Sequence, residues 1–154
     1  MSTNQQYDLI VIGGGASGMM AAGRAAERGQ RVLLVEKNKD LGKKLSITGG
    51  GRCNILNAEP DTRKLLENYG ESGKFLFSTF AQHGMQDSWD FFQKRGLPIV
   101  VEARKRAFPE VQSAPAVTKV MRNYCTENNV ELKVKTRVDG FLVEDGQIIG
   151  IKTN

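Results

Sequence analysis

The chain has 154 residues, of which 40% are hydrophobic and 25% charged, values typical of a single soluble globular domain. Two cysteines and one histidine, without metal-ligand spacing, exclude a disulfide scaffold and give no metal site. A net charge of +5 would suit nucleic acid, but apart from Arg104, Lys105 and Arg106 the basic residues are spread along the chain. We therefore expect no nucleic-acid partner.

The N-terminal segment carries no targeting signal that we can identify. Residues Met1 to Gln6 are polar and lack a charged region followed by an apolar stretch, so we expect no signal peptide. No apolar run approaches the length needed to cross a bilayer. We expect a cytoplasmic location and no membrane association.

The first elements form a strand–helix–strand pattern. The apolar run within Tyr7 to Ile12 predicts a buried parallel strand, and Ser17 to Arg28 predicts a helix rich in small residues that Gly29 ends. Arg31 to Glu36 predicts a second buried strand. Together these elements have the size of a minimal βαβ unit, with parallel strands.

A glycine fingerprint lies between the first strand and the helix. Gly13 permits a tight turn, Gly15 lets the backbone approach a pyrophosphate, and Gly18 lets the helix lie close to the strand. Glu36, at the end of the second strand, has the spacing expected of an acid that accepts ribose hydroxyls and repels a 2′-phosphate. The pattern predicts that the helix N-terminus holds the phosphates of a dinucleotide, with NADP disfavoured at this site. The alternative is a glycine-rich turn without a ligand.

A second glycine cluster lies in the loop that follows, residues 37 to 57. We expect three successive glycines, Gly49, Gly50 and Gly51, to have no packing role and to expose backbone amides to a pyrophosphate or flavin edge. Arg52 would add a fixed positive charge. A flexible surface loop is the alternative.

The remaining pattern predicts three short helices, a strand, a longer helix, another strand and a hairpin. Ser113 is the expected N-cap of the longer helix, with Pro115 in its first turn, and Asp145-Gly146 is the expected two-residue turn of the hairpin. Arg104 to Arg106 is either an exposed turn or a segment facing the phosphates of a nicotinamide cofactor. The expected ranges are 62–69, 74–82 and 86–95 for the short helices, 98–102 and 131–138 for the strands, a helical face through Val117, Val120, Met121 and Tyr124, and 141–144 with 148–151 for the hairpin.

These segments resemble the BaiN/YhiN-type family of NAD(P)/FAD-dependent oxidoreductases, a group that is similar to aminoacetone oxidase. The resemblance is carried by the fingerprint Gly13 to Gly18, by Gly42 to Asn54 with its GGGRCN stretch, by Phe75 to Phe92, and by Arg106 to Pro109. It covers nearly the whole chain. Thr48 is a small departure, because the family usually carries serine there.

The resemblance implies an incomplete Rossmann-like, two-dinucleotide FAD-binding α/β domain over residues 1–154, with a helical insertion and a C-terminal β-hairpin. Its expected parts are a nucleotide-binding core at 5–37, a flavin-side loop at 38–57, the insertion at about 58–97, and a strand–helix–strand–hairpin segment at 98–154. It implies FAD as cofactor, with NAD(P)H as an electron donor. The implied cofactor-binding residues are Gly13, Gly15, Ala16, Ser17, Gly18, Glu36, Lys37, Lys44, Gly49, Gly50, Gly51, Arg52, Cys53, Asn54 and Val138, the last through its backbone.

The function that follows is an FAD-dependent oxidoreductase, or the N-terminal part of one, that passes hydride between the flavin and either NAD(P)H or a small organic substrate. The family's chains are more than twice as long, which indicates a fragment or a truncated product. A non-catalytic dinucleotide-binding fragment and a NAD-dependent dehydrogenase remain alternatives, and an enzyme acting on RNA rests on the charge alone. We expect Cys53 to be structural rather than redox-active. The sequence identifies no catalytic acid or base, no particular substrate and no oligomeric state.

Overall fold

The computed structural model describes residues 6–154, which form two compact units. The first unit contains the chain up to Lys44 together with Met121–Asn154, and the second contains Leu45–Val120. Residues 1–5, which include most of the polar N-terminal segment and the first residue of the expected 5–37 core, lie outside the described part. No helix within 6–154 has both the length and the apolar character required to span a bilayer.

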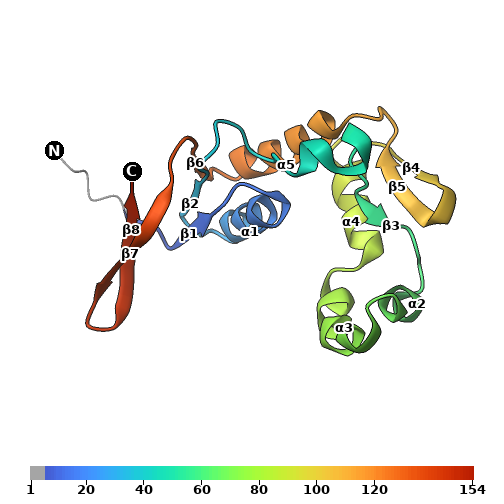
Figure 1. Ribbon diagram of the computed structural model, residues 1–154, viewed down its shortest axis with the longest axis horizontal. Helices are drawn as coiled ribbons and strands as arrows, with labels where there is room; N and C mark the ends of the chain where they lie inside the picture. Colours follow the sequence, from blue (N-terminus) through green and yellow to red (C-terminus); the bar gives the residue numbers. More distant parts are fainter. Residues whose placement is uncertain (1–5) are drawn as a thin grey trace. The chain divides into compact units, whose positions relative to one another are not determined.

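The first unit is built on a parallel sheet, as the sequence predicts (Figure 1). Strands β1 (Leu9–Ile12) and β2 (Val32–Val35) pair in parallel, and helix α1 (Ala16–Glu27) connects them. Strand β6 (Glu131–Lys133) pairs in parallel with the other side of β2, so the strand order is β1-β2-β6. All four residues of β2 are buried, as expected for a central strand.

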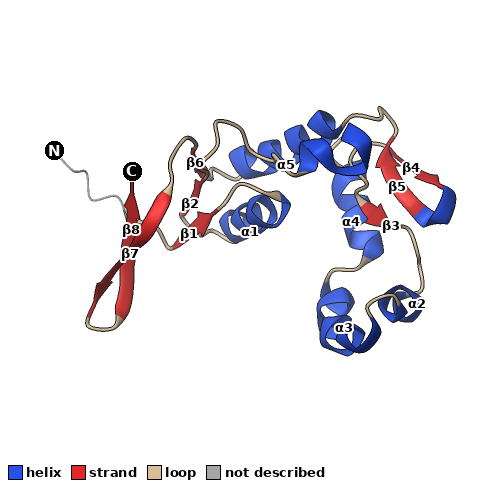
Figure 2. Ribbon diagram, in the orientation of Figure 1, coloured by secondary structure: helices blue, strands red, loops and turns tan. Residues whose placement is uncertain are grey.

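A hairpin completes the first unit (Figure 2). Strands β7 (Val138–Glu144) and β8 (Gln147–Thr153) are antiparallel and longer than predicted. Asp145 and Gly146 connect them with φ angles of 48° and 77°. Two successive positive φ values are those of a type I′ turn, so the Asp-Gly prediction is confirmed.

The prediction of a single strand over residues 131–138 is wrong. Strand β6 ends at Lys133, and Lys135 has a φ of 52°, which interrupts extended backbone. The amides of Lys135 and Thr136 donate instead to the carbonyls of Asn38 and Glu36, at 2.9 and 3.0 Å. Val138 therefore begins the hairpin rather than ending the preceding strand.

The second unit combines the predicted short helices with a small antiparallel sheet. The sheet has the order β3-β5-β4, and two of its strands, β3 and β5, were not predicted. Both are short, and β5 ends in a proline, so neither shows the alternation by which strands are identified. The elements are β3 (Leu56–Asn57), α2 (Thr62–Glu67), α3 (Gly73–Gln82), α4 (Met85–Gln93), β4 (Ile99–Glu102) and β5 (Arg106–Pro109), with 3₁₀ turns at Leu45–Gly51, Gly70–Ser72 and Ala103–Lys105.

Helix α5 (Ala114–Glu127) begins directly after Ser113, where its start was predicted. Its expected apolar face is confirmed, because Val117, Val120, Met121 and Tyr124 are all buried. In the first unit, the ring of Tyr124 lies against Gly23 of α1, where an added Cβ would come within 2.4 Å of the ring. This close approach requires a residue without a side chain at position 23.

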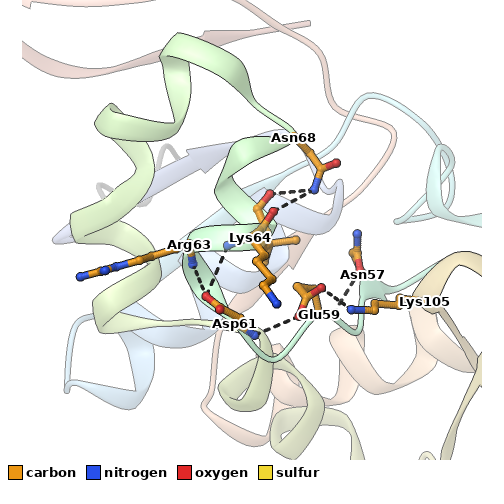
Figure 3. Close-up of polar contacts among 8 residues, drawn as sticks. Asn57, Glu59, Asp61, Arg63, Lys64, Asn68 and Lys105 are labelled. Carbon is orange, nitrogen blue, oxygen red and sulfur yellow. Dashed lines mark hydrogen bonds and ion pairs between the residues drawn. The ribbon is translucent and has the colours of Figure 1, made fainter.

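A polar network joins the start of α2 to the turn between β4 and β5 (Figure 3). Asp61 caps α2 by accepting hydrogen bonds from the amides of Arg63 and Lys64, at 2.9 and 3.3 Å. Glu59 accepts from the amide of Asp61 at 3.2 Å and forms an ion pair with Lys105. Lys105 thus belongs to an exposed turn that is tied to its own unit. Whether residues 104–106 face the phosphates of a nicotinamide cofactor stays a prediction.

Candidate functional site

The turn between β1 and α1 brings the helix against the end of the strand. Gly13 has a φ of +105°, which favours glycine, and its amide donates to the carbonyl of Val35 at 2.7 Å. A Cβ on Gly18 would lie 1.9 Å from the carbonyl oxygen of Gly13. The first and third glycines of the fingerprint therefore have the structural reasons that the sequence predicted for them.

The N-terminus of α1 is open. Gly15 is its N-cap residue, and within the described chain no side chain caps it and no acidic residue stands in its first turn. A Cβ on Gly15 would meet no described atom within 4 Å, and Ala16 and Ser17 are exposed. The first amides of a helix lack intrahelical acceptors and carry partial positive charge, so this end of α1 is suited to a phosphate group.

Glu36 reaches the glycine turn from the end of β2. Its side chain is buried, and its Oε2 accepts a hydrogen bond from the amide of Gly14 at 2.7 Å. Its Oε1 accepts from the amide and from the side-chain nitrogen of Asn38, at 2.8 and 2.5 Å. Gly14 and Glu36 are twenty-two positions apart in the sequence, yet they are in direct contact. The acid and the glycine fingerprint therefore belong to the same candidate site.

The hydrogen bonds keep this buried carboxylate ionised. Burial acts to raise the pKa of Glu36, but the hydrogen bonds from Asn38 and Gly14 outweigh it and hold the pKa below its ordinary value. A carboxylate has about four acceptor positions, and the described residues fill three. One acceptor position on Oε2, beside the turn, has no donor among the described residues.

Gly14 is a site residue that the sequence analysis missed. Its amide is bonded to Glu36, its carbonyl accepts from the amide of Gly42 at 2.8 Å, and an added Cβ would lie 2.3 Å from Leu41 Cδ2. The fingerprint leaves this position unspecified, so the motif gives no reason to single it out. The available signal was the unbroken run of three glycines at residues 13–15.

The second glycine cluster is only partly as expected. Gly49, Gly50 and Gly51 have φ values of 57°, 66° and 85°, which no other residue type adopts as easily. A Cβ on Gly49 would lie 2.8 Å from the amide nitrogen of Asn54 and 2.9 Å from the ring of Phe108, so the expectation that these glycines have no packing role is wrong for Gly49. Around Gly50 and Gly51 the described residues leave open space where a Cβ would go.

Arg52 is held by its own unit. Its Nη1 donates to Glu102 Oε1 at 2.7 Å and to Gln112 Oε1 at 2.9 Å, and its guanidinium lies 4.1 Å from the ring centroid of Phe108. The sequence predicted a fixed positive charge, and it missed the carboxylate of Glu102 that compensates it. Arg52 therefore shapes the glycine loop by tying it to the end of β4.

The other predicted cofactor residues divide between the two units. Lys37, Lys44 and Val138 belong to the first unit, where the lysines are exposed and Val138 is half-buried. Cys53 and Asn54 belong to the second, with the glycine loop. The structure brings together the first fingerprint and Glu36, and within the second unit it brings together the residues of the 49–54 segment.

Both cysteines are buried, and neither forms a disulfide. Burial raises the pKa of the Cys53 thiol and raises that of Cys125 to about 11. We expect both to react with a thiol reagent such as DTNB at about pH 8 only as fast as the chain opens, and rapidly in denaturant. Immediate labelling of Cys53 in the folded chain would contradict a structural role.

Within residues 6–154, no group of three or more His, Cys, Asp or Glu side chains is placed to hold a metal ion.

Comparison with known proteins identifies relatives over nearly the whole chain. The family model described as "HI0933-like protein Rossmann domain" matches residues 7–154. The ribosomal RNA dihydrouridine synthase of Escherichia coli is 29% identical over 134 residues, covering 87% of this chain and 32% of that protein. The 3-dehydro-bile acid delta(4,6)-reductase of Clostridium scindens is 30% identical over 147 residues, covering 89% and 35%. The chain thus spans about a third of the length of these relatives.

Solved structures share the fold. The 3-ketosteroid-delta4-(5alpha)-dehydrogenase of Rhodococcus jostii superimposes with a TM-score of 0.71 at 14% identity, covering 99% of this chain and 43% of that one. Identity at this level shows the fold alone. The prediction of a Rossmann-type α/β fold with a helical insertion and a terminal hairpin is confirmed.

Proposed function

This chain belongs to the HI0933-like protein Rossmann-domain family, and we propose that it binds the ADP half of FAD and forms the nucleotide-binding part of an FAD-dependent oxidoreductase. The proposal rests above all on one contact, the hydrogen bond of 2.7 Å between the Gly14 amide and Glu36 Oε2. It places an ionised acid beside the open N-terminus of α1. The two ligand features that suit this pair are a ribose with free hydroxyls and an adjoining diphosphate.

The residues have distinct roles in this proposal. The amides at the start of α1, from Gly15 to Gly18, hold the diphosphate, and Gly15 leaves space for it to approach. Glu36 accepts a ribose hydroxyl on the remaining position of Oε2. Val138 contacts the adenine through its backbone, and Lys37, Lys44 and the 49–54 segment are the further candidates for contact with FAD.

FAD would supply the redox chemistry by accepting and passing on a hydride. We propose NAD(P)H as the donor and a BaiN/YhiN-type enzyme as the whole protein. What the described residues contribute is binding and orientation. The 3-dehydro-bile acid delta(4,6)-reductase, a relative named for a reduction, supports this assignment.

We propose a small organic substrate for the whole protein, and RNA is the second candidate. The bile-acid reductase among the relatives favours the first. The ribosomal RNA dihydrouridine synthase and the net charge of +5 favour the second. A gel-shift assay with structured RNA at increasing salt separates them, because RNA binding would weaken steeply as salt rises and absence of a shift at low salt excludes it.

Titration of the folded 154-residue chain with FAD, ADP and NADH tests the proposed function. We expect FAD and ADP to bind, and Glu36→Gln to weaken both by about tenfold or more, because a hydrogen bond to a charged group contributes about 1.5–3 kcal/mol. Glu144→Gln, which removes an exposed carboxylate from the hairpin of the same unit, is the matched control.

Each alternative has its own outcome in this titration. Preference for NADH over FAD would support a NAD-dependent dehydrogenase. FAD binding without oxidation of NAD(P)H by the bound complex would support a non-catalytic fragment. A folded chain that binds none of the three ligands would contradict the proposed function.

A further inference from the structure

We propose that Asn38 is a positioning residue, which orients the carboxylate of Glu36 so that one oxygen is presented to the ribose of the bound nucleotide. This inference rests on the proposed function and extends it by one residue. It starts from an asymmetry in the hydrogen bonds of the carboxylate. Oε1 receives two donors, both from Asn38, whereas Oε2 receives one, from the amide of Gly14.

The two donors of Asn38 leave Oε1 without further capacity. The amide nitrogen lies 2.8 Å from Oε1 and the side-chain Nδ2 lies 2.5 Å from it. Each oxygen of a carboxylate has two lone pairs, so Oε1 is saturated. The remaining lone pair belongs to Oε2, the oxygen next to the glycine turn. Asn38 thereby decides which oxygen of Glu36 meets a ligand.

Asn38 can do this because its own backbone is fixed. Its carbonyl accepts from the amide of Lys135 at 2.9 Å. On the preceding side, the amide of Glu36 donates to Lys133 at 2.9 Å and the carbonyl of Glu36 accepts from Thr136 at 3.0 Å. The backbone of residues 36–38 is therefore held by β6 and the segment after it. The side chain of Asn38 donates its hydrogen bond to Oε1 from this fixed backbone.

Removing the side chain would free one lone pair on Oε1 and let the carboxylate turn. Glu36 would keep its charge and its bond to Gly14 in part of the population, so the diphosphate site on α1 would survive. What would be lost is the fixed alignment of Oε2. The expected consequence is a loss of discrimination for the ribose hydroxyl rather than a loss of all nucleotide binding.

The test compares binding of ADP and 2′-deoxy-ADP by the full chain, measured by calorimetry. Wild type should prefer ADP by about tenfold, the contribution of one hydrogen bond to a charged acceptor. In Asn38→Ala the ratio of the affinity for ADP to the affinity for 2′-deoxy-ADP should fall toward one, chiefly because ADP binds less tightly. Asn128→Ala is the matched control, because Asn128 also donates its side-chain nitrogen to a neighbouring oxygen, the Tyr124 carbonyl at 2.8 Å, and its loss should leave the ratio unchanged.

A second variant guards against a general loss of folding. Asn38→Leu keeps the backbone donor and the approximate size of the side chain but removes the side-chain donor to Oε1, and it should also bring the ratio of the two affinities toward one. If either folded variant keeps the wild-type ratio, Asn38 does not position Glu36 and the inference is wrong. If wild type binds ADP without preferring it to 2′-deoxy-ADP, the inference is also wrong. If wild type binds neither nucleotide, the proposed function itself fails.

Discussion

Replacing Gly18 with alanine is expected to destabilise the chain by about 3 kcal/mol, the upper part of the range for overpacked interiors. The added Cβ would lie 1.9 Å from the carbonyl oxygen of Gly13, and the obstacle is backbone, which cannot rotate away as a side chain can. Either α1 moves away from β1 or the turn at Gly13 opens. Chemical denaturation followed by circular dichroism measures the loss.

Gly15→Ala is the control that separates folding from binding. Gly15 has an extended backbone conformation, with φ of −79°, and open space where the Cβ would go. We expect a change in the free energy of unfolding within about 0.5 kcal/mol, as for an ordinary surface substitution. FAD and ADP should nevertheless bind less tightly, because the methyl group occupies the approach of the diphosphate.

The two glycine variants therefore give opposite patterns. Loss of stability with Gly18→Ala and loss of binding with Gly15→Ala would support the roles assigned to them. A stable Gly18→Ala chain would show that the helix is not held against the turn as closely as described. Unchanged nucleotide affinity in a folded Gly15→Ala chain would remove the N-terminus of α1 from the binding site.

The βαβ unit could be predicted because its determinants are local. An apolar run, three glycines at fixed spacing and a small-residue helix specify β1, the turn and α1 without reference to the rest of the chain. The same holds for the Asp145-Gly146 turn, since two successive positive φ values favour that pair of residues. Each of these features is encoded within a few neighbouring positions.

What escaped prediction depends on partners distant in sequence. The sequence predicts Arg52 as a positive charge, but its partner Glu102 lies fifty positions later and only the structure shows that the two are in contact. Strand β5 is identified by its pairing with β3 and β4 rather than by its own short pattern. Asn38 follows the acid of the fingerprint by two positions, and only the geometry of its two donors distinguishes it from the other polar residues of that loop.

Replacing Glu36 with alanine should destabilise the ligand-free chain by about 2 kcal/mol at neutral pH. The buried amide of Gly14 would lose its acceptor, and Asn38 would lose the partner of both its donors. Glu36→Gln keeps an oxygen that can accept from Gly14, so it should cost about half as much. The carboxylate thus has a structural role that is separable from the proposed ligand contact.

The dependence on pH identifies the charged form as the source of this stability. Because the pKa of Glu36 is lowered in the folded chain, its contribution is present above the ordinary carboxyl pKa and is lost as the pH falls through the folded value. The difference in unfolding free energy between wild type and Glu36→Gln should therefore shrink on acidification below about pH 4.5. Glu59 and Asp90, whose pKa values are also lowered, titrate in both proteins and cancel in the difference. A difference that stays constant or grows with acid would mean that the neutral side chain serves equally well, and that Glu36 need not be ionised to hold the turn.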